Sequence, residues 1–437
     1  MLQTIRNAWK IEEIRKRILF TLLILVIVRI GCAIPTPGVN PEYFAAWFQS
    51  QAGNTFNFFD VMTGGSFMSQ SIFALNITPY ITSSIIMQLL TIAIPSLEEM
   101  SKEESGKQRI NDITRYLTVV LALIEAAAMT IGFGRYGLLN EFTWYNVVVA
   151  SITMTVGSLI LMWFGEKITE KGIGNGISMI LVFNILSSFP GEIKNLFQRF
   201  VVGQSVPVDI IAAVIIIAIL LALTAFTVQL CAGERRIPVQ YSSKIQGRRS
   251  YGGRGTNMPI KVNTAGVIPV IFASSLLSIP ALIASFAGIG GDTVPGKIIA
   301  GLTTSNWCNP EHPIYTLGLI VYIILIMAFA YFYTSITYNP IEVSRNLTKA
   351  GGVIPGIRPG KPTSDFLNNV LNYLVFYGGV GLIIIAVIPI IFSGLLGVTR
   401  MAFTGTSLII IVGVVIETIS QIESMMRVRR YDGFLND

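Results

Sequence analysis

Charged residues are scarce in this sequence. Asp, Glu, Lys and Arg make up 13% of its 437 residues, whereas soluble domains carry about 25%. Hydrophobic residues reach 52%. This composition excludes an ordinary soluble globular protein and predicts an all-α integral membrane protein that crosses the bilayer many times.

Histidine and cysteine are also rare, which excludes several kinds of site. The single histidine, His312, rules out the HExxH pattern of zinc proteases. The three cysteines, Cys32, Cys231 and Cys308, lie far apart and form no CxxC pair. Neither a disulfide framework nor a metal site is indicated.

Motifs for nucleotide binding and intramembrane proteolysis are missing as well. Gly360-Lys361 fails the GxxxxGK[ST] pattern because position 355 is Pro and Pro362 follows the lysine. Residues 289–292, IGGD, miss a GxGD protease pattern at their first position. We therefore expect no enzymatic activity and no cofactor, so any energy input must come from a partner.

Hydrophobic runs long enough to cross a bilayer recur along the chain. A window of about 19 residues predicts ten spans, near 18–35, 72–94, 116–135, 145–165, 174–189, 208–232, 264–287, 315–337, 370–393 and 404–421. The first run follows Arg15-Lys16-Arg17 but lacks a small-residue cleavage site. It is therefore expected to remain as a membrane helix.

Lys and Arg fall almost entirely on one side of these spans. They crowd the two termini and the loops after the second, fourth, sixth and eighth spans. The opposite loops hold only Arg135, Lys194, Arg199, Lys297 and Arg400. The positive-inside rule therefore places both termini in the cytoplasm.

The stretch 56–95 has two unequal parts. Residues 56–71 are too short to span and contain Asp60, Gly64 and Gly65, so they require protein or water around them. The part that follows, 72–94, is long enough to span but carries Pro79 and several polar side chains. A half-helix folded back into a pore fits this pattern. An external loop helix followed by a polar-lined bundle helix fits it equally.

Two cytoplasmic loops are longer than a helical bundle needs. Residues 233–263 alternate polar and apolar residues and turn through several glycines, which predicts a basic hairpin. Residues 339–368 carry Gly356, Arg358 and Gly360 in a second turn. Topological anchoring accounts for most of these charges, and the length and glycine tips favour docking surfaces for a large cytoplasmic partner.

The chain divides near its middle. A cytoplasmic amphipathic segment at 1–17 precedes a first half at 18–189, and an external loop at 190–207 separates it from a second half at 208–421. A cytoplasmic tail occupies 422–437. Five spans in each half require opposite orientations if the halves share a fold.

An ion-coupled secondary transporter with inverted repeats is the alternative function. Such carriers need ionisable groups near the midplane of the membrane. The candidates are Arg29, Glu125 and Glu417. Only Glu125 falls in the middle of a predicted span, which weakens this alternative without removing it.

Several motifs resemble the SecY family of protein-conducting channels. They are ALNITPYITSSIIMQLL at 74–90, GIGNGIS at 172–178, KVNTAGVIPVIFASS at 261–275, Asn339-Pro340, PGIRPG at 355–360 and GTSL at 405–408. Their order and mutual spacing match over essentially the whole chain. Together they are far more specific than any one motif.

The resemblance implies ten transmembrane helices in two inverted pseudo-symmetric halves around a central hourglass pore. It implies a channel in the bacterial cytoplasmic membrane that passes unfolded preproteins across and releases hydrophobic segments sideways into lipid. The expected partners are the SecE and SecG subunits, the SecA motor ATPase, the ribosome with its RNA, and the signal sequences of substrates.

The resemblance also assigns residues to the pore. A plug half-helix at about 58–71 includes Phe58, Asp60, Gly64, Gly65 and Ser66. The constriction ring is formed by Ile77, Ile81, Ile177, Leu181, Ile271 and Ile410. Branched apolar side chains resist ions by dewetting and deform around a passing chain. Without the family, each would be read as core packing.

A lateral gate and a docking site complete the expectations. The gate would run between the second and third spans on one side and the seventh and eighth on the other. Its assigned residues are Thr82, Gln88, Glu125, Asn263, Ser274, Ser275 and Ile279. Contact with SecA or the ribosome is assigned to Arg248, Arg249 and Arg358.

The charge distribution makes a prediction about topology. A reporter enzyme fused near Gly252 should be cytoplasmic, and one near Gly301 should be external, because the basic loops stay inside. Reporter activity in whole cells measures this, with fusions at both termini as cytoplasmic controls. The reverse pattern would contradict the order of the predicted spans.

Overall fold

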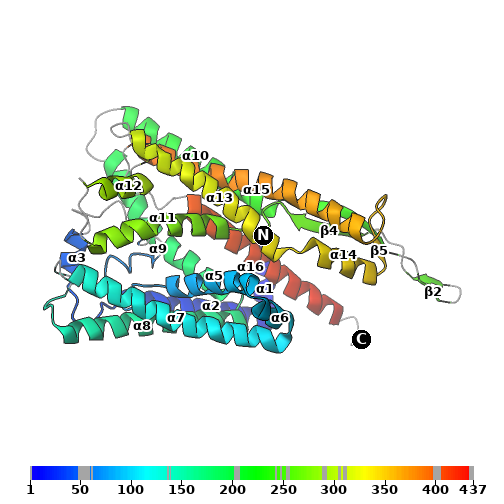
Figure 1. Cartoon of the computed structure of the whole chain (residues 1–437), viewed down its shortest axis with the longest axis horizontal. Coiled ribbons are helices and arrows are strands. Elements are labelled where there is room, and N and C mark those ends of the chain that lie inside the picture. The colour runs from blue at the N-terminus through cyan, green and yellow to red at the C-terminus, as the bar shows by residue number, and fades with distance from the viewer. Residues whose placement is uncertain are drawn as a thin grey trace.

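The computed structural model describes residues 2–47, 60, 63–134, 137, 139–200, 207–241, 244–246, 249–251, 256–287, 293–303, 307–308, 313–396 and 405–432. This part of the chain is mostly helical. Long helices lie side by side along the longest axis of the molecule, and the strands gather at one end (Figure 1).

Each of the ten predicted spans overlaps one of the longer helices. The helices are α2 (Glu12–Cys32), α5 (Thr78–Ala93), α7 (Glu104–Phe133), α8 (Trp144–Lys171), α9 (Gly176–Phe200), α10 (Pro207–Ala232), α11 (Ile268–Ala287), α13 (Leu317–Thr337), α15 (Lys361–Leu396) and α16 (Gly405–Asp432). Among the described residues, five helices are long and apolar enough to cross a membrane on their own, or six if α5 and the helix after it count as one bent span. The multi-span prediction is confirmed.

Shorter helices lie between or before the long ones. They are α1 (Leu2–Lys10), α3 (Pro41–Trp47), α6 (Pro95–Lys102), α12 (Val294–Leu302), α14 (Pro340–Lys349) and the 3-10 turn η4 (Pro313–Thr316). Helix α1 is amphipathic. Its Ala8 packs with Ile14, Ile173 and Ile422, so it is anchored to the bundle near α16.

Helix α5 begins later than the hydrophobic run that contains it. Residues 64–77 form turns instead, and α5 starts only at Thr78. Asn76 has a φ of 52°, which a right-handed helix does not allow. Pro79 then lies in the first turn of α5, where its missing N–H costs no hydrogen bond.

Two further boundaries differ from the expected ones. Helix α5 meets α6 at an angle of 109°, so the chain turns sharply at Ile94-Pro95. Helix α9 continues through Pro190 to Phe200, although the sequence predicts a loop from residue 190. The hydropathy window ends where polar residues begin, but a helix can continue beyond its apolar part.

The basic hairpin in 233–263 is confirmed. Strand β1 (Glu234–Tyr241) pairs antiparallel with β4 (Thr256–Lys261), and β2 (Lys244–Gln246) pairs with β3 (Arg249–Tyr251). The second long loop joins the same sheet through β5 (Gly352–Val353), giving the order β4-β1-β5. We call β1, β4, β5, α14 and the turn 354–360 the loop platform.

The loop platform has its own apolar core. Ile237 and Val239 from β1 and Ile260 from β4 pack with Leu347, Ile354, Leu367, Leu371 and Leu374. The core therefore joins both long loops to the start of α15. The platform is a folded extension of the bundle rather than two separate loops (Figure 1).

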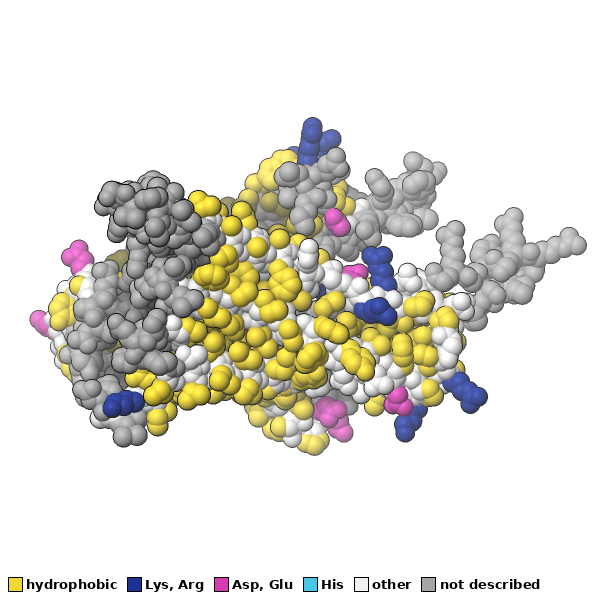
Figure 2. Space-filling view, turned by 90° about the horizontal axis from the view of Figure 1, so that it is seen from above, with side chains coloured by type: hydrophobic (Ala, Val, Ile, Leu, Met, Phe, Trp, Pro, Cys, Tyr) yellow, Lys and Arg dark blue, Asp and Glu magenta, His cyan; other side chains and the backbone are white. Residues whose placement is uncertain are grey.

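The outer surface of the bundle is apolar along its middle. On α2, for example, Leu22, Leu23, Val26 and Ile30 are all exposed. Figure 2 shows hydrophobic side chains covering the centre of one face, with most of the visible Lys and Arg toward the end that carries the strands. Such a band is expected where lipid is the solvent.

Candidate pore lining and plug segment

A segment made mainly of turns contacts three helices of the bundle, α2, α8 and α9. We call residues 63–77 the turn segment. Its middle is tied to the chain after α2, because Thr36 N donates to Gln70 O at 2.9 Å and Ile72 N donates to Ile34 O at 3.0 Å. A β-bridge between Pro35 and Ser71 lies between these two bonds.

Asp60 organises the start of the turn segment. Its Oδ1 accepts a hydrogen bond from Met68 N at 2.9 Å. Its carbonyl oxygen accepts from Gly65 N at 3.0 Å and from Thr63 Oγ1 at 3.0 Å. The predicted plug residue Asp60 therefore holds a compact turn, and Phe58 lies outside the described residues.

Gly64 touches two neighbouring helices through its backbone. Arg29 Nη1 on α2 donates to Gly64 O at 2.8 Å. A Cβ atom at Gly64 would lie 2.7 Å from Asn184 O and from Ser187 Oγ on α9. Because the φ of residue 64 is 67° and a Cβ atom has no room there, this position requires glycine.

The other two predicted plug residues differ in their surroundings. Gly65 has a φ of 86°, and a Cβ there would meet nothing within 4 Å. Ser66 is buried with 1% exposure. The turn segment therefore rests against the bundle at Gly64 and Ser66 and faces open space at Gly65.

A buried polar network holds the far end of the turn segment. Asn184 Nδ2 on α9 donates to Asn76 Oδ1 at 3.2 Å, and Ser158 Oγ on α8 donates to Asn76 O at 2.8 Å. All three residues are at most 1% exposed. Buried polar groups need such partners, and this network supplies them to the carbonyl and the side chain of Asn76. The sequence analysis missed Ser158 and Asn184, whose only signal is polarity inside apolar runs.

The predicted ring residues fall into two apolar clusters that meet on α9. Ile77 is fully buried and packs with the half-buried Ile81 and Ile177, in a cluster that also includes α2 and α8. Ile271 and Ile410 pack with residues 182, 185 and 414 in the second cluster. Leu181 on α9 is 6% exposed. The ring assignment itself stays a prediction.

The polar residues assigned to the gate mostly bond their own helices. Thr82 Oγ1 donates to Thr78 O at 3.1 Å, and Ser274 Oγ donates to Val270 O at 2.9 Å. Gln88 and Ile279 are exposed, whereas Glu125 and Ser275 are half-buried. Helices α7 and α11, which carry Glu125 and the two serines, do contact each other.

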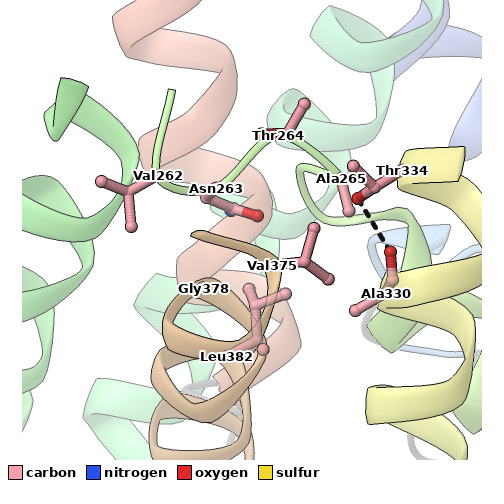
Figure 3. Close-up of a pocket in the computed structure, with 10 residues that line it drawn as sticks. Val262, Asn263, Thr264, Ala265, Ala330, Thr334, Val375, Gly378 and Leu382 are labelled. Atoms are coloured by element: carbon pink, nitrogen blue, oxygen red, sulfur yellow. Dashed lines mark hydrogen bonds between the residues drawn. The ribbon is translucent and has the colours of Figure 1, made fainter. Parts of the chain in front are cut away.

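Asn263 lies in a pocket of the second half of the chain. The pocket is lined by Val262, Asn263, Thr264, Ala265, Ala330, Thr334, Val375, Gly378, Gly379 and Leu382. Figure 3 shows Asn263 above α15 and across from α13, where Thr334 Oγ1 donates to Ala330 O. Asn263 therefore packs where α13 and α15 approach the start of α11.

The arginines assigned to partner contact lie in two loops, and only one of these loops has its arginine side chain described. Arg358 is exposed, and its carbonyl accepts a hydrogen bond from Thr363 Oγ1 at 2.8 Å. Ser344 Oγ on α14 donates to Gly360 O at 2.8 Å and fixes the other side of this turn. Arg249 begins β3, but its side chain and all of Arg248 lie outside the described residues.

A further contact, unforeseen from the sequence, joins the loop before α9 to α16. Gly174 N donates to Gln421 Oε1 at 2.6 Å. Thr418 Oγ1 lies 3.6 Å from Met179 Sδ, one turn away on α16.

Among the described residues no group of three or more His, Cys, Asp or Glu could hold a metal ion. The site consists of hydrogen bonds and apolar packing.

Sequence comparison places the chain among bacterial translocase subunits. The sequence model of the SecY family matches residues 71–419. The protein translocase subunit SecY of Streptomyces galbus is 42% identical over 450 residues, covering 100% of both chains. The same subunit of Thermus thermophilus is 38% identical over 446 residues, covering 100% of this chain and 98% of the relative.

Solved structures show the same fold. A structure described as a protein conducting channel matches with a TM-score of 0.64 at 18% identity, covering 96% of each chain. A second, of a SecY protein whose plug domain stabilises the closed state, matches with the same TM-score of 0.64. With full-length relatives near 40% identity and a family match over most of its length, this chain belongs to the SecY family.

Proposed function

We propose that this chain forms a protein-conducting channel that passes unfolded polypeptides across the cytoplasmic membrane and releases hydrophobic segments into lipid. The observation that carries the proposal is the turn segment, a non-helical stretch enclosed by α2, α8 and α9. Within a bilayer such a backbone is tolerated only inside protein or beside a water-filled cavity. A membrane protein built only of packed helices has no need of it.

The turn segment leads directly into the apolar clusters. Its last residue, Ile77, belongs to the first cluster, and α9 carries residues of both clusters. Apolar constrictions hold little water and gate by dewetting. The proposed closed state combines a plug held by hydrogen bonds with an apolar ring that adapts to a passing chain.

The transporter alternative finds less support in the placement of its ionisable groups. Arg29 donates to the Gly64 carbonyl, and Glu417 is exposed on α16. Glu125 lies on α7, half-buried. These three residues lie on three different helices, and within the described part of the chain no hydrogen bond or ion pair joins them. Ion-coupled carriers usually bind their ion at one site near the midplane.

The proposal includes the wider assembly and its topology. The two halves of the chain open as a clamshell about the connection between α9 and α10, with both termini in the cytoplasm. SecE and SecG are the proposed membrane partners, and SecA or the ribosome supplies the driving force. Support for ribosome docking comes from two similar structures, Sec61 in a canine ribosome–channel complex and a yeast Ssh1 complex bound to the 80S ribosome.

Reconstitution tests the function and the ring together. Vesicles with this chain, SecE and SecG should import a presecretory protein when SecA and ATP are added. Ile410→Asn should make the buried cluster around Ile271 wettable, so resting ion leak rises and precursors with defective signal sequences pass better.

A control variant, Ile384→Asn on α15, places the same polar group at an exposed apolar position. It should leave leak and signal dependence unchanged. Unaltered leak and selectivity in Ile410→Asn would remove residue 410 from the pore. Substrate-specific ion-coupled uptake without polypeptide import would establish a transporter instead.

Arg358 is predicted to dock the cytoplasmic partner. Its backbone is fixed by Thr363 and by the Ser344–Gly360 bond, and its planar five-donor guanidinium suits a carboxylate or RNA phosphate better than lysine does. Arg358→Lys should impair SecA-driven import partially and Arg358→Glu severely. Membrane insertion and SecE binding should stay normal in both variants.

Lys361→Glu is the matched control, because this exposed residue lies three positions away and undergoes the same charge change. Import rates of the three variants are compared in the same vesicles. Equal, mild losses at both positions would mean that the platform contributes only diffuse charge, and that Arg358 makes no specific contact.

A further inference from the structure

Arg29 is a charged residue in the last turn of an otherwise apolar helix. It lies on α2 between exposed Ile27 and Ile30, and its Nη1 donates to Gly64 O at 2.8 Å. A charge at this depth is costly unless it finds polar partners. The bond therefore gives the guanidinium a partner and at the same time fixes one end of the turn segment.

The Gly64 end and the middle of the turn segment are held by different kinds of contact. Near Gln70 the segment is bound by backbone hydrogen bonds to residues 34 and 36. At Gly64 the contacts to other helices are the Arg29 side chain and close packing on α9. Side-chain contacts can release by a rotamer change, whereas the backbone ladder cannot. The Gly64 end is the one suited to move.

The chemistry of the Arg29 contact makes it reversible. The acceptor is a neutral carbonyl, so separation leaves no uncompensated carboxylate behind. Arg29 itself is exposed in the last turn of α2, so once the bond breaks its long side chain can reach the water at the membrane interface. A charge-assisted bond is nevertheless about twice as strong as a neutral one, which is enough to bias the segment toward its packed position.

We propose that Arg29 is the latch of the plug: a positioning residue whose bond to Gly64 O holds the turn segment closed, and whose release frees the Gly64 end when a substrate enters. This inference rests on the proposed channel function. It adds a named residue and a named atom to the closing step.

A purely structural role for Arg29 makes different predictions. A cation in the last turn of α2 also complements the helix dipole, and its long side chain can reach the membrane interface. In that role the position of the turn segment is irrelevant to the effect of a substitution. The experiment must therefore show that Arg29 acts through the plug.

The primary measurement is resting ion conductance of vesicles containing the chain with SecE and SecG, without SecA. Arg29→Gln removes the charge and should raise the conductance about tenfold, as expected for loss of one charge-assisted bond. It should also let precursors with defective signal sequences pass. Arg29→Lys keeps the charge, so its resting conductance should lie between those of the wild type and Arg29→Gln. Lys297→Gln on α12 removes an exposed cation elsewhere and should change nothing.

A disulfide rescue separates the latch from a structural role. The Ser66 side chain lies against the Cys32 thiol, and both residues are buried. In a background with Cys231→Ala and Cys308→Ala, Ser66→Cys should form a disulfide with Cys32 on oxidation by copper phenanthroline. If Arg29 acts by holding the plug, this disulfide should return the conductance of Arg29→Gln to the wild-type level.

Substitutions at two neighbouring glycines test the packing of the Gly64 end against α9. Gly64→Ala would press a methyl group against Asn184 O and should raise conductance as Arg29→Gln does. Gly65→Ala shares the positive φ but meets nothing within 4 Å, so it should raise conductance much less. Combining Gly64→Ala with Arg29→Gln should add little, because both release the same end.

Deletion of residues 63–70 distinguishes failure of the latch from failure of the channel. If the deletion raises conductance but Arg29→Gln does not, or if the disulfide fails to restore the seal, the latch is wrong and the channel stands. If the deletion leaves conductance unchanged while import continues, the turn segment is no seal. If wild-type vesicles import no polypeptide at all, the proposed function itself is overturned.

Discussion

Every polar group of a backbone inside a bilayer must find a partner within the protein, and the turn segment makes this constraint severe. Its residues 64–77 give up the internal hydrogen bonds of a helix. Its backbone is bonded by turn bonds within the segment and by residues 34 and 36. Arg29 on α2 and Ser158 on α8 bond two further carbonyls, and Asn184 on α9 bonds the Asn76 side chain. The packing of these helices around one irregular stretch is therefore a condition for its existence, and the proposed plug depends on it.

Hydrophobicity alone was enough to predict the long helices, because each apolar run had to cross lipid. It could not predict where α5 begins, since the left-handed Asn76 sits within an apolar run. Nor could it pair Asn76 with Asn184, 108 positions away, because hydropathy does not say which helices are neighbours. Gly64 and Gly65 were noted in the sequence and assigned to the plug through the family resemblance, whereas their contacts required the structure.

The loop platform shows how two separately predicted loops become one device. The alternation of polar and apolar residues and the glycine tips predicted the hairpin correctly. The sequence of 339–368 did not predict that β5 pairs with β1, or that Leu347 and Ile354 pack in the same apolar core as the hairpin. The shared core gives the platform a mechanical consequence. A force applied at Arg358 by a docked partner reaches α15 through a packed core and not through a flexible loop.

Apolar contacts between helices gain little from burial in lipid, because lipid tails are as apolar as leucine. A closed channel must therefore be favoured by close packing and a small number of polar ties. Gln421 bonds the loop before α9 to α16, Asn184 bonds the turn segment to α9, and Arg29 bonds it to α2. The first tie joins the two proposed halves, and the others hold the turn segment, which is the proposed plug. Since each such bond contributes only about 1 kcal/mol in a membrane, a closed state held by so few polar ties is weak enough for the proposed opening by one inserted hydrophobic helix, and the same bonds can form again when that helix leaves.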